Sequence, residues 1–94
     1  MIPGETSVRF TVINVGSKPI EHPILQRDLR EWLSIRIGDG EIDLGDGRVM
    51  FYDRHYSYAD SLLNKHATAI VQDRDSRAIV IFGDAAIVRR ADLS

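Results

Sequence analysis

Two Asp-Gly pairs, at residues 39–40 and 46–47, are the feature that most constrains the fold of this chain. An Asp-Gly pair is typical of the two central positions of a type I′ turn, because both positions require a positive φ, and such turns join the strands of β-hairpins. Between the pairs, residues 41–44 alternate acidic and apolar side chains. The stretch GDGEIDLGDG therefore predicts two tight turns connected by a short, half-buried strand.

The predicted turns also set a register. With two-residue loops, Leu44 lies opposite Val49, and the inward positions are apolar on all three strands, which a shift of one residue would destroy. On the other face, Arg36 lies opposite Asp43, which is a favourable cross-strand pair. The sequence thus predicts a three-stranded antiparallel meander over residues 34–52.

Two rival interpretations of this stretch fail on the residues themselves. A calcium-binding EF-hand loop requires glycine at its sixth position and glutamate at its twelfth, but counting from Asp39 these positions hold Leu44 and Met50. A phosphate-binding G-x-G-x-x-G loop requires a helix directly after it, whereas the strand-like RVMFY follows here. We therefore expect no divalent cation at the acidic residues of the stretch, which are Asp39, Glu41, Asp43 and Asp46.

The N-terminal part of the chain changes its hydrophobic period once. Residues 7–15 alternate apolar and polar side chains, which predicts a half-buried strand, and a loop with two prolines follows over residues 16–23. From Pro23 the apolar residues recur at helical spacing, and proline suits the first turn of a helix because its missing N–H has no partner there. We expect this helix to end near Leu33, since continuing it would place Arg36 on the apolar face.

The second half of the chain has less distinct patterns. The segment 57–66 predicts a short helix that is capped by Ser57 or Asp60. Two strands are expected after it, over residues 67–73 and 78–82, with a short hairpin loop between them. The second of these strands, AIVIF, is apolar on both faces, which favours a central position in the sheet.

The last segment, residues 84–92, fits either a final strand or a helix capped by Asp84, and the strand is favoured. The predicted order is β-α-βββ-α-ββ with a final short strand or helix. This order indicates the α+β class, with an antiparallel sheet packed against one or two helices. A length of 94 residues with 44% hydrophobic residues is typical of one small domain, spanning residues 1–94.

Charge and composition argue against several functional classes. The net charge of −2 disfavours nucleic-acid binding, which depends on clustered Lys and Arg. Aspartates lie close in sequence to the few pairs of basic residues, which predicts a solvated face of mixed charge. The arginines concerned are Arg74, Arg77, Arg89 and Arg90.

Cysteine is absent, which removes disulfides and thiolate zinc sites. No apolar run approaches the roughly 18 residues that cross a membrane, and the first residues lack the basic and apolar regions of a secretory signal. The three histidines, His22, His55 and His66, match no known spacing of metal ligands. We therefore expect a cytoplasmic protein with no membrane contact, no metal and no cofactor.

The segment FYDRHYSYAD, residues 51–60, holds the richest set of reactive side chains. His55 could act as a general base oriented by Asp53 or Asp60, with Ser57 nearby. The glycines that flank a nucleophilic serine in a G-x-S-x-G elbow are missing, however. The competing interpretation is a capped loop whose tyrosines cover the edge of the sheet and keep their hydroxyls in water.

Two functional hypotheses follow. The first is a small non-catalytic module that binds another protein through a surface of aromatic, Met and charged side chains, which are residue types common at interfaces. The second is a small enzyme or ligand-binding domain with its site at Asp53, His55, Ser57 and Asp60. We also expect self-association, as a dimer formed through an exposed sheet edge or the outer face of the meander, since these edges lack guarding Lys and Pro. The residues of the predicted interaction surface are Met50, Tyr52, Arg54, His55, Tyr56 and Tyr58.

Overall fold

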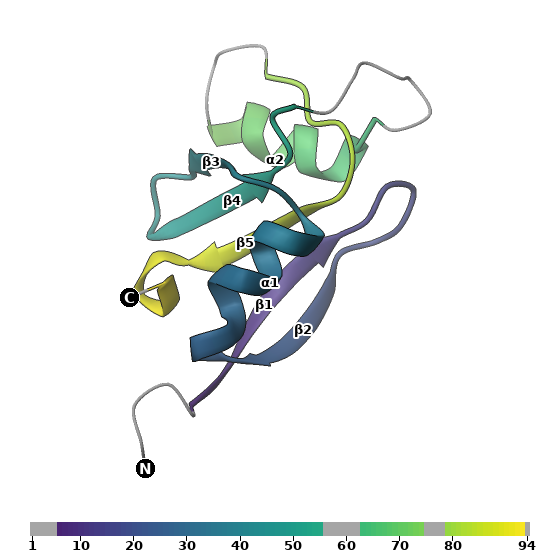
Figure 1. Cartoon of the computed structure of the whole chain (residues 1–94). Coiled ribbons are helices and arrows are strands. Elements are labelled where there is room, and N and C mark those ends of the chain that lie inside the picture. Colours follow the sequence, from purple (N-terminus) through teal and green to yellow (C-terminus); the bar gives the residue numbers. More distant parts are fainter. Residues whose placement is uncertain (1–5, 56–62, 75–78, 94) are drawn as a thin grey trace.

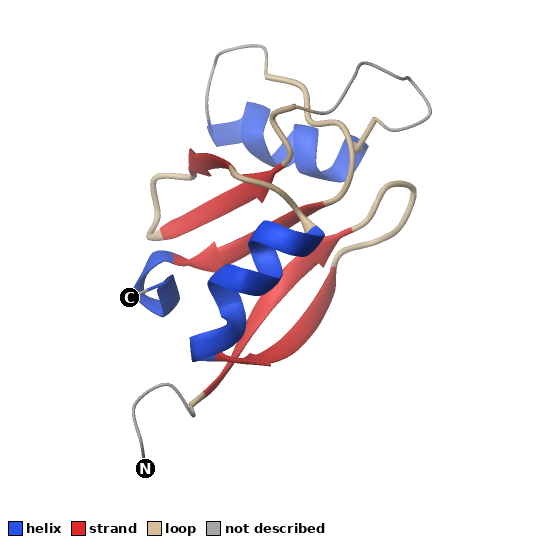
Figure 2. Cartoon of the chain, viewed as in Figure 1, coloured by secondary structure: helices blue, strands red, loops and turns tan. Residues whose placement is uncertain are grey.

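The computed structural model describes residues 6–55, 63–74 and 79–93. Its centre is a five-stranded antiparallel sheet with the strand order β2-β1-β5-β4-β3. Helix α1 covers one face of this sheet and helix α2 lies against the other (Figures 1 and 2). The predicted α+β class with an antiparallel sheet is confirmed.

The first hairpin pairs β1 (Ser7–Ile13) with β2 (Ile20–Leu25). The alternation that predicted β1 is confirmed, but the prediction of a loop and then a helix from Pro23 is wrong. Pro23 lies in β2 opposite Arg9, and β2 forms one edge of the sheet. An edge strand tolerates proline because its outward positions need no N–H for pairing.

Helix α1 (Leu29–Arg36) follows a 3₁₀ turn over Gln26–Asp28, so it begins and ends later than predicted. Its buried face consists of Leu29 and Leu33, and Ile37 continues this row one turn further. Residues spaced by four lie on the same side of a helix. Arg36, three residues after Leu33 and at the end of the helix, is nevertheless exposed, so extending the helix does not bury its charge.

The second hairpin joins β3 (Gly40–Asp43) to β4 (Arg48–Tyr52). The three-stranded meander over residues 34–52 is wrong, because its first segment belongs to α1. Asp43, and not Leu44, lies opposite Val49, which is a shift of one residue from the predicted register.

The loop of this hairpin explains the shift. It contains three residues, since the N–H of Leu44 donates to the carbonyl oxygen of Arg48 at 3.0 Å. Gly45 and Gly47 have φ values of +82° and +86°. No residue other than glycine has a positive φ in the described ranges, so Asp46 cannot occupy a central position of a type I′ turn.

The expected pairing across the meander fails for the same reason. Arg36 belongs to a helix and does not face Asp43, whose carboxylate lies 3.3 Å from Nη2 of Arg90 instead. The shift leaves no apolar side chain exposed, because β4 is covered on both sides: Val49 and Met50 are both fully buried although they point to opposite faces.

Helix α2 (Lys65–Arg74) replaces the strand that was predicted over residues 67–73. Its buried residues are Ala67 and Val71, one helical turn apart. Asn64 caps the helix, because its Oδ1 accepts a hydrogen bond from the N–H of Ala67 at 3.1 Å. Most of the helix predicted over residues 57–66 lies outside the described residues.

The central strand is β5 (Ala85–Arg89), which pairs with β1 on one side and with β4 on the other. The prediction of a final strand is therefore confirmed, whereas the prediction of a central strand at 78–82 is wrong. Residues 79–81 carry no regular structure, and Phe82 forms only an isolated bridge with Leu63. The described chain ends in a 3₁₀ turn over Arg90–Leu93.

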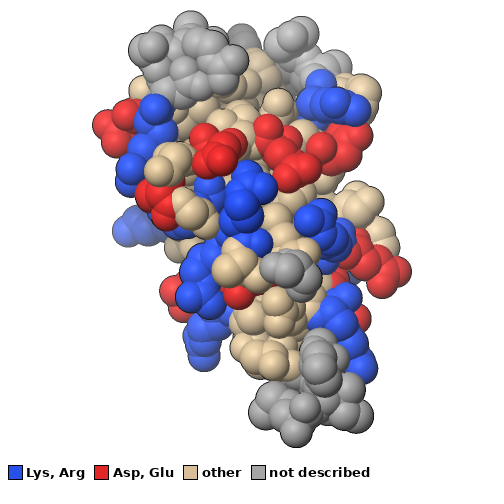
Figure 3. All heavy atoms as spheres, turned by 90° about the vertical axis from the view of Figure 1, so that its left-hand side faces the viewer, with Lys and Arg blue, Asp and Glu red and all other residues tan. Residues whose placement is uncertain are grey.

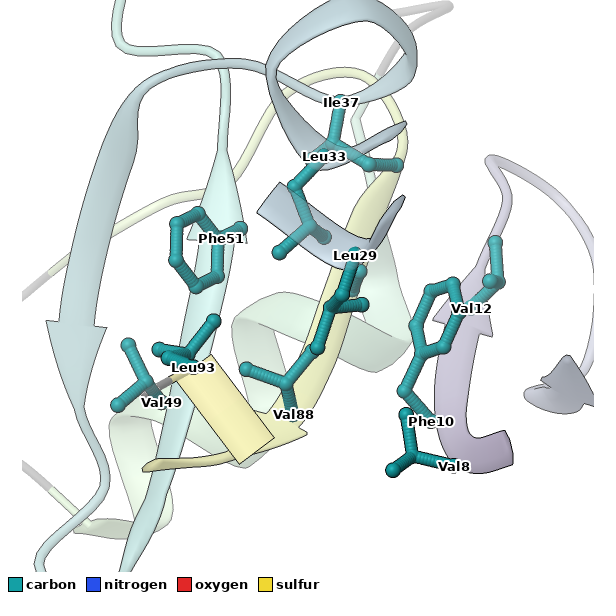
Figure 4. Close-up of a cluster of buried hydrophobic side chains, with 11 residues drawn as sticks. Val8, Phe10, Val12, Leu29, Leu33, Ile37, Val49, Phe51, Val88 and Leu93 are labelled. Carbon is teal, nitrogen blue, oxygen red and sulfur yellow. The ribbon is translucent and has the colours of Figure 1, made fainter. Parts of the chain in front are cut away.

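Two hydrophobic clusters, one on each face of the sheet, form the core. Figure 4 shows the cluster under α1, where side chains from the helix meet those of β1, β4 and β5. The cluster on the other face lies under α2 and includes the completely buried Met50 and Ile81. No buried side-chain nitrogen or oxygen in the described ranges lacks a hydrogen-bond partner.

Candidate functional site: a groove at Trp32

The reactive residues predicted after β4 do not form a catalytic arrangement within the described part of the chain. Asp53 accepts a hydrogen bond from the backbone N–H of His55 at 2.9 Å, so this contact does not orient the imidazole. Nε2 of His55 lies 3.9 Å from Oδ2 of Asp39, and the His55 side chain is 73% exposed. Ser57 and Asp60 lie outside the described residues.

The predicted interaction surface is also dispersed. Met50 is completely buried in the core, so it cannot contribute to an outer face. The ring of Tyr52 covers Gly40, where an added methyl group would come within 2.7 Å of Cζ. Arg54 is exposed and lies 3.3 Å from the carboxylate of Asp39. The other two residues of the prediction, Tyr56 and Tyr58, lie outside the described residues.

Arginines surround the acidic hairpin loop. The Asp46 carboxylate lies 2.9 Å from Arg48 and 3.3 Å from Arg74. The hydrogen bond from the Arg48 side chain, together with the charges of both arginines, lowers the pKa of Asp46 below its ordinary value. Figure 3 shows this side of the molecule, where basic and acidic side chains are interspersed. No group of three or more potential metal ligands occurs in the described ranges.

The C-terminal arginines are paired in the same way. Arg89 donates two hydrogen bonds to Asp92, at 3.1 and 3.3 Å, and Arg90 donates one to Asp43. Arg77 lies outside the described residues. Each described member of the basic group thus has an acidic partner, which fits the predicted face of mixed charge.

A different region, between α1 and the edge strand β2, carries two hollows. One hollow has a volume of about 350 Å³ and the other about 260 Å³. Trp32 and Arg36 line both of them, so the two hollows adjoin and form one groove, which we call the Trp32 groove. The first hollow is lined by Ile24, Asp28, Glu31, Trp32, Ile35 and Arg36. The second is lined by Val12, Asn14, Ile20, His22, Trp32, Arg36, Ile37 and Asp84.

Trp32 and His22, which line the groove, form an aromatic cluster with Phe10. The β1–β2 register places His22 directly opposite Phe10, and the two rings stack with centroids 5.3 Å apart. The indole of Trp32 meets both rings edge-on, at 4.9 Å from Phe10 and 5.1 Å from His22. Edge-on and offset contacts are the favourable geometries for aromatic rings. These contacts restrict the orientation of the indole.

The His22 ring also has a defined tautomer. Nδ1 lies 2.9 Å from the carbonyl oxygen of Pro23, which can only accept a hydrogen bond, so Nδ1 carries a hydrogen. In the neutral ring, Nε2 is then an acceptor. Because His22 lines the second hollow, this arrangement adds a polar group beside its apolar wall.

Each of the two hollows is lined by one exposed large apolar side chain. Ile35 is 71% exposed and belongs to the first hollow, while Ile20 is 54% exposed and belongs to the second. The described residues contain one other exposed large hydrophobic residue, Val80, which lines neither hollow. Exposed apolar area that is concentrated around a hollow is typical of a binding surface.

Charged side chains complete the rim. Asp28 and Glu31 line the first hollow, and Arg36 lies between the two hollows. None of the three takes part in an ion pair within the described part of the chain. Their charges are therefore available to a bound group.

The open edge of β2 next to the groove is poorly suited to pairing with another strand. The N–H of Gln26 bonds to the carbonyl oxygen of Thr6, and hydrogen-bonded positions alternate along antiparallel strands. The outward positions of β2 are therefore Glu21, Pro23 and Leu25, and proline has no N–H to donate.

Sequence reasoning did not identify the groove. The apolar residues that recur at helical spacing after Pro23 include Trp32, and this spacing predicts a buried side chain, while Ile20 and Ile35 belong to no predicted site. A usable signal was present, however, because Ile35 falls outside the buried row of α1. An apolar residue on the exposed side of an amphipathic helix indicates a second contact surface.

No helix in the described ranges is long and apolar enough to cross a membrane. No protein-family model, curated protein or solved structure matches this chain.

Proposed function

We propose that this chain is a protein-interaction module that binds a segment of another protein in the Trp32 groove. The observation that carries the proposal is the position of the exposed hydrophobic residues: Ile35 lines the first hollow and Ile20 lines the second, and Trp32 lines both. Aromatic side chains at the centre of an apolar patch are the usual anchors of protein interfaces.

The division of the groove into two parts suits a chain segment. Two hollows, of about 350 and 260 Å³, share Trp32 and Arg36 as lining residues. Two neighbouring hollows suit two side chains of one chain segment. Because Pro23 weakens the β2 edge for strand addition, these side chains would supply the contact.

A peptide selection tests the proposal. A phage library of random twelve-residue peptides is selected on the whole protein, and the enriched peptides are then measured by fluorescence polarisation. Replacing Ile35 with serine removes exposed apolar area from the groove without touching the core, and we expect it to weaken binding at least fivefold. Val80→Ser removes a similar exposed side chain outside the groove and serves as the matched control.

The proposal is wrong if no peptide is enriched above background. It is equally wrong if the enriched peptides bind the Ile35→Ser and Val80→Ser variants with the same affinity, since binding would then be located elsewhere on the surface. Circular dichroism of both variants, which should match the parent protein, separates a loss of binding from a loss of folding.

A further inference from the structure

We infer that the first hollow of the Trp32 groove recognises a lysine or arginine side chain of the partner segment, adjacent to an apolar side chain. This inference rests on the proposed function and adds the chemistry of the partner. It depends on which charges line the hollow and on where the apolar surface lies between them.

The carboxylates supply the charge. Asp28 and Glu31 are three residues apart at the start of α1, a spacing that places them on the same side of a helix. Both line the first hollow, and neither has a basic partner in the described ranges. A cation that enters this hollow would meet both carboxylates, whereas an anion would be repelled by them.

The remaining walls suit a long side chain that is charged at its tip. Ile24 and Ile35 line the same hollow and can cover the methylene groups of a lysine or arginine. Trp32 lines the hollow too, and an indole ring attracts a cation that lies over its face. A short acidic or neutral side chain could not use the apolar walls and the carboxylates together.

Arg36 restricts the location of the cation. It lies on the boundary between the hollows, so a second positive charge is repelled from the middle of the groove. The basic side chain is therefore expected beside Asp28 and Glu31, with the apolar neighbour at Trp32. This arrangement gives the partner segment one direction in the groove.

The two carboxylates also have a structural role that must be separated from recognition. Negative charges in the first turn stabilise a helix through its dipole, so replacing them is expected to lower stability slightly whether or not they bind a partner. Comparing several peptides on the same variant avoids this problem, because any change in stability is shared by all of the measurements.

The chain contains a single tryptophan, so its indole signal reports directly on the groove. The probes are three acetylated and amidated tripeptides, each with leucine at both ends and with arginine, glutamine or glutamate in the middle. They are titrated into ¹⁵N-labelled protein while the indole N–H resonance and the tryptophan fluorescence are recorded. We expect the arginine peptide to bind about fivefold more tightly than the glutamine peptide, as two partly exposed ion pairs would supply, and the glutamate peptide to bind most weakly.

The double variant Asp28→Asn, Glu31→Gln is expected to bind all three peptides within twofold of one another. Glu41→Gln removes an exposed acid from β3, outside the groove, and should leave the order of affinities unchanged. The inference is overturned if the peptides bind the parent protein equally, or if the preference for arginine survives in the double variant.

Failure of the proposed function has a different result. In that case the indole resonance does not move with any of the three peptides, and library peptides show no dependence on Ile35. Binding of all three peptides with equal affinity would retain the groove as an interaction site and overturn only the charge preference. An indole signal that depends on protein concentration without peptide would identify a second copy of the chain as the occupant and overturn the inference.

Discussion

Replacing Asn64 with alanine should be among the most destabilising single substitutions in this chain, although Asn64 is a polar residue. The side chain is 1% exposed and makes three hydrogen bonds. Nδ2 donates to the carbonyl oxygens of Ile13 at 2.8 Å and Gly83 at 3.0 Å, and Oδ1 accepts from the N–H of Ala67. One amide thus connects the start of α2 to the end of β1 and to the segment before β5.

The expected loss follows from these contacts. Removing the cap of α2 costs about 1 kcal/mol, and leaving the two buried carbonyl oxygens without their donor costs about 1 kcal/mol each. The sum of roughly 3 kcal/mol is a large part of the roughly 5–14 kcal/mol that is typical of a domain of 94 residues. For a domain of this size, each kcal/mol lowers the melting temperature by roughly 4–8 °C.

Urea unfolding followed by circular dichroism measures the loss, and a shared m-value confirms that both proteins unfold in the same way. Gln72→Ala is the matched control, because this exposed amide makes one hydrogen bond, to the carbonyl oxygen of Ile79 at 3.1 Å. The control should lose no more than about 0.5 kcal/mol. An Asn64→Ala loss below 1 kcal/mol would refute the reasoning, since water would then have replaced the missing donor.

Three further predictions concern the hairpin, the acidic loop and the oligomeric state. Gly38→Ala should lower the free energy of unfolding by about 2–4 kcal/mol, because φ is +148° and the new methyl group would lie 2.5 Å from the backbone of Asp53. The control Gly16→Ala, at a position with a positive φ but open space, should lower it by only about 1 kcal/mol in the same urea unfolding assay. Equal losses in the two variants would contradict the clash. Because the folded-state pKa of Asp46 is lowered, its contribution to stability is present above the unfolded-state pKa of about 3.9 and is lost as the pH falls through the lowered value. Asp46→Asn should therefore flatten the acid limb of the stability curve, and unchanged steepness would show that Arg48 does not stabilise the carboxylate. Light scattering over a hundredfold range of concentration tests the predicted dimer, because the measured mass should approach twice 10.6 kDa at high concentration. A mass that stays at the monomer value would contradict the dimer.

Parts of the fold could be predicted from local patterns. The alternation over β1 identified a half-buried strand, and the turn residues before β4 located a hairpin within one residue of its observed register. The α+β class and the final strand β5 followed from the same kind of reasoning. These elements share a cause: each is specified by neighbouring residues, through side-chain period or through the φ that glycine permits.

The candidate site could not be predicted in that way. The Trp32 groove joins side chains of α1 to side chains of β2, and β2 was expected to be a loop followed by a helix. The residues from Ile20 to Leu25 form a strand because β1 pairs with them, and no pattern within the segment shows this. Sequence reasoning therefore directed attention to the reactive side chains after β4, whose described members Asp53 and His55 line neither hollow of the groove.

The identity of α2 and of the central strand depended on tertiary contacts for a related reason. A short apolar run has the same appearance in a buried strand and in a buried helix, and its neighbours decide between them. Residues 67–73 became helical because Asn64 caps them and the side chains of Ala67 and Val71 fill the space above the sheet. The sequence by itself determined which residues are apolar and at what spacing they recur. Only packing on both faces of the sheet determined which of them are buried together, because burial depends on residues that are distant in the sequence.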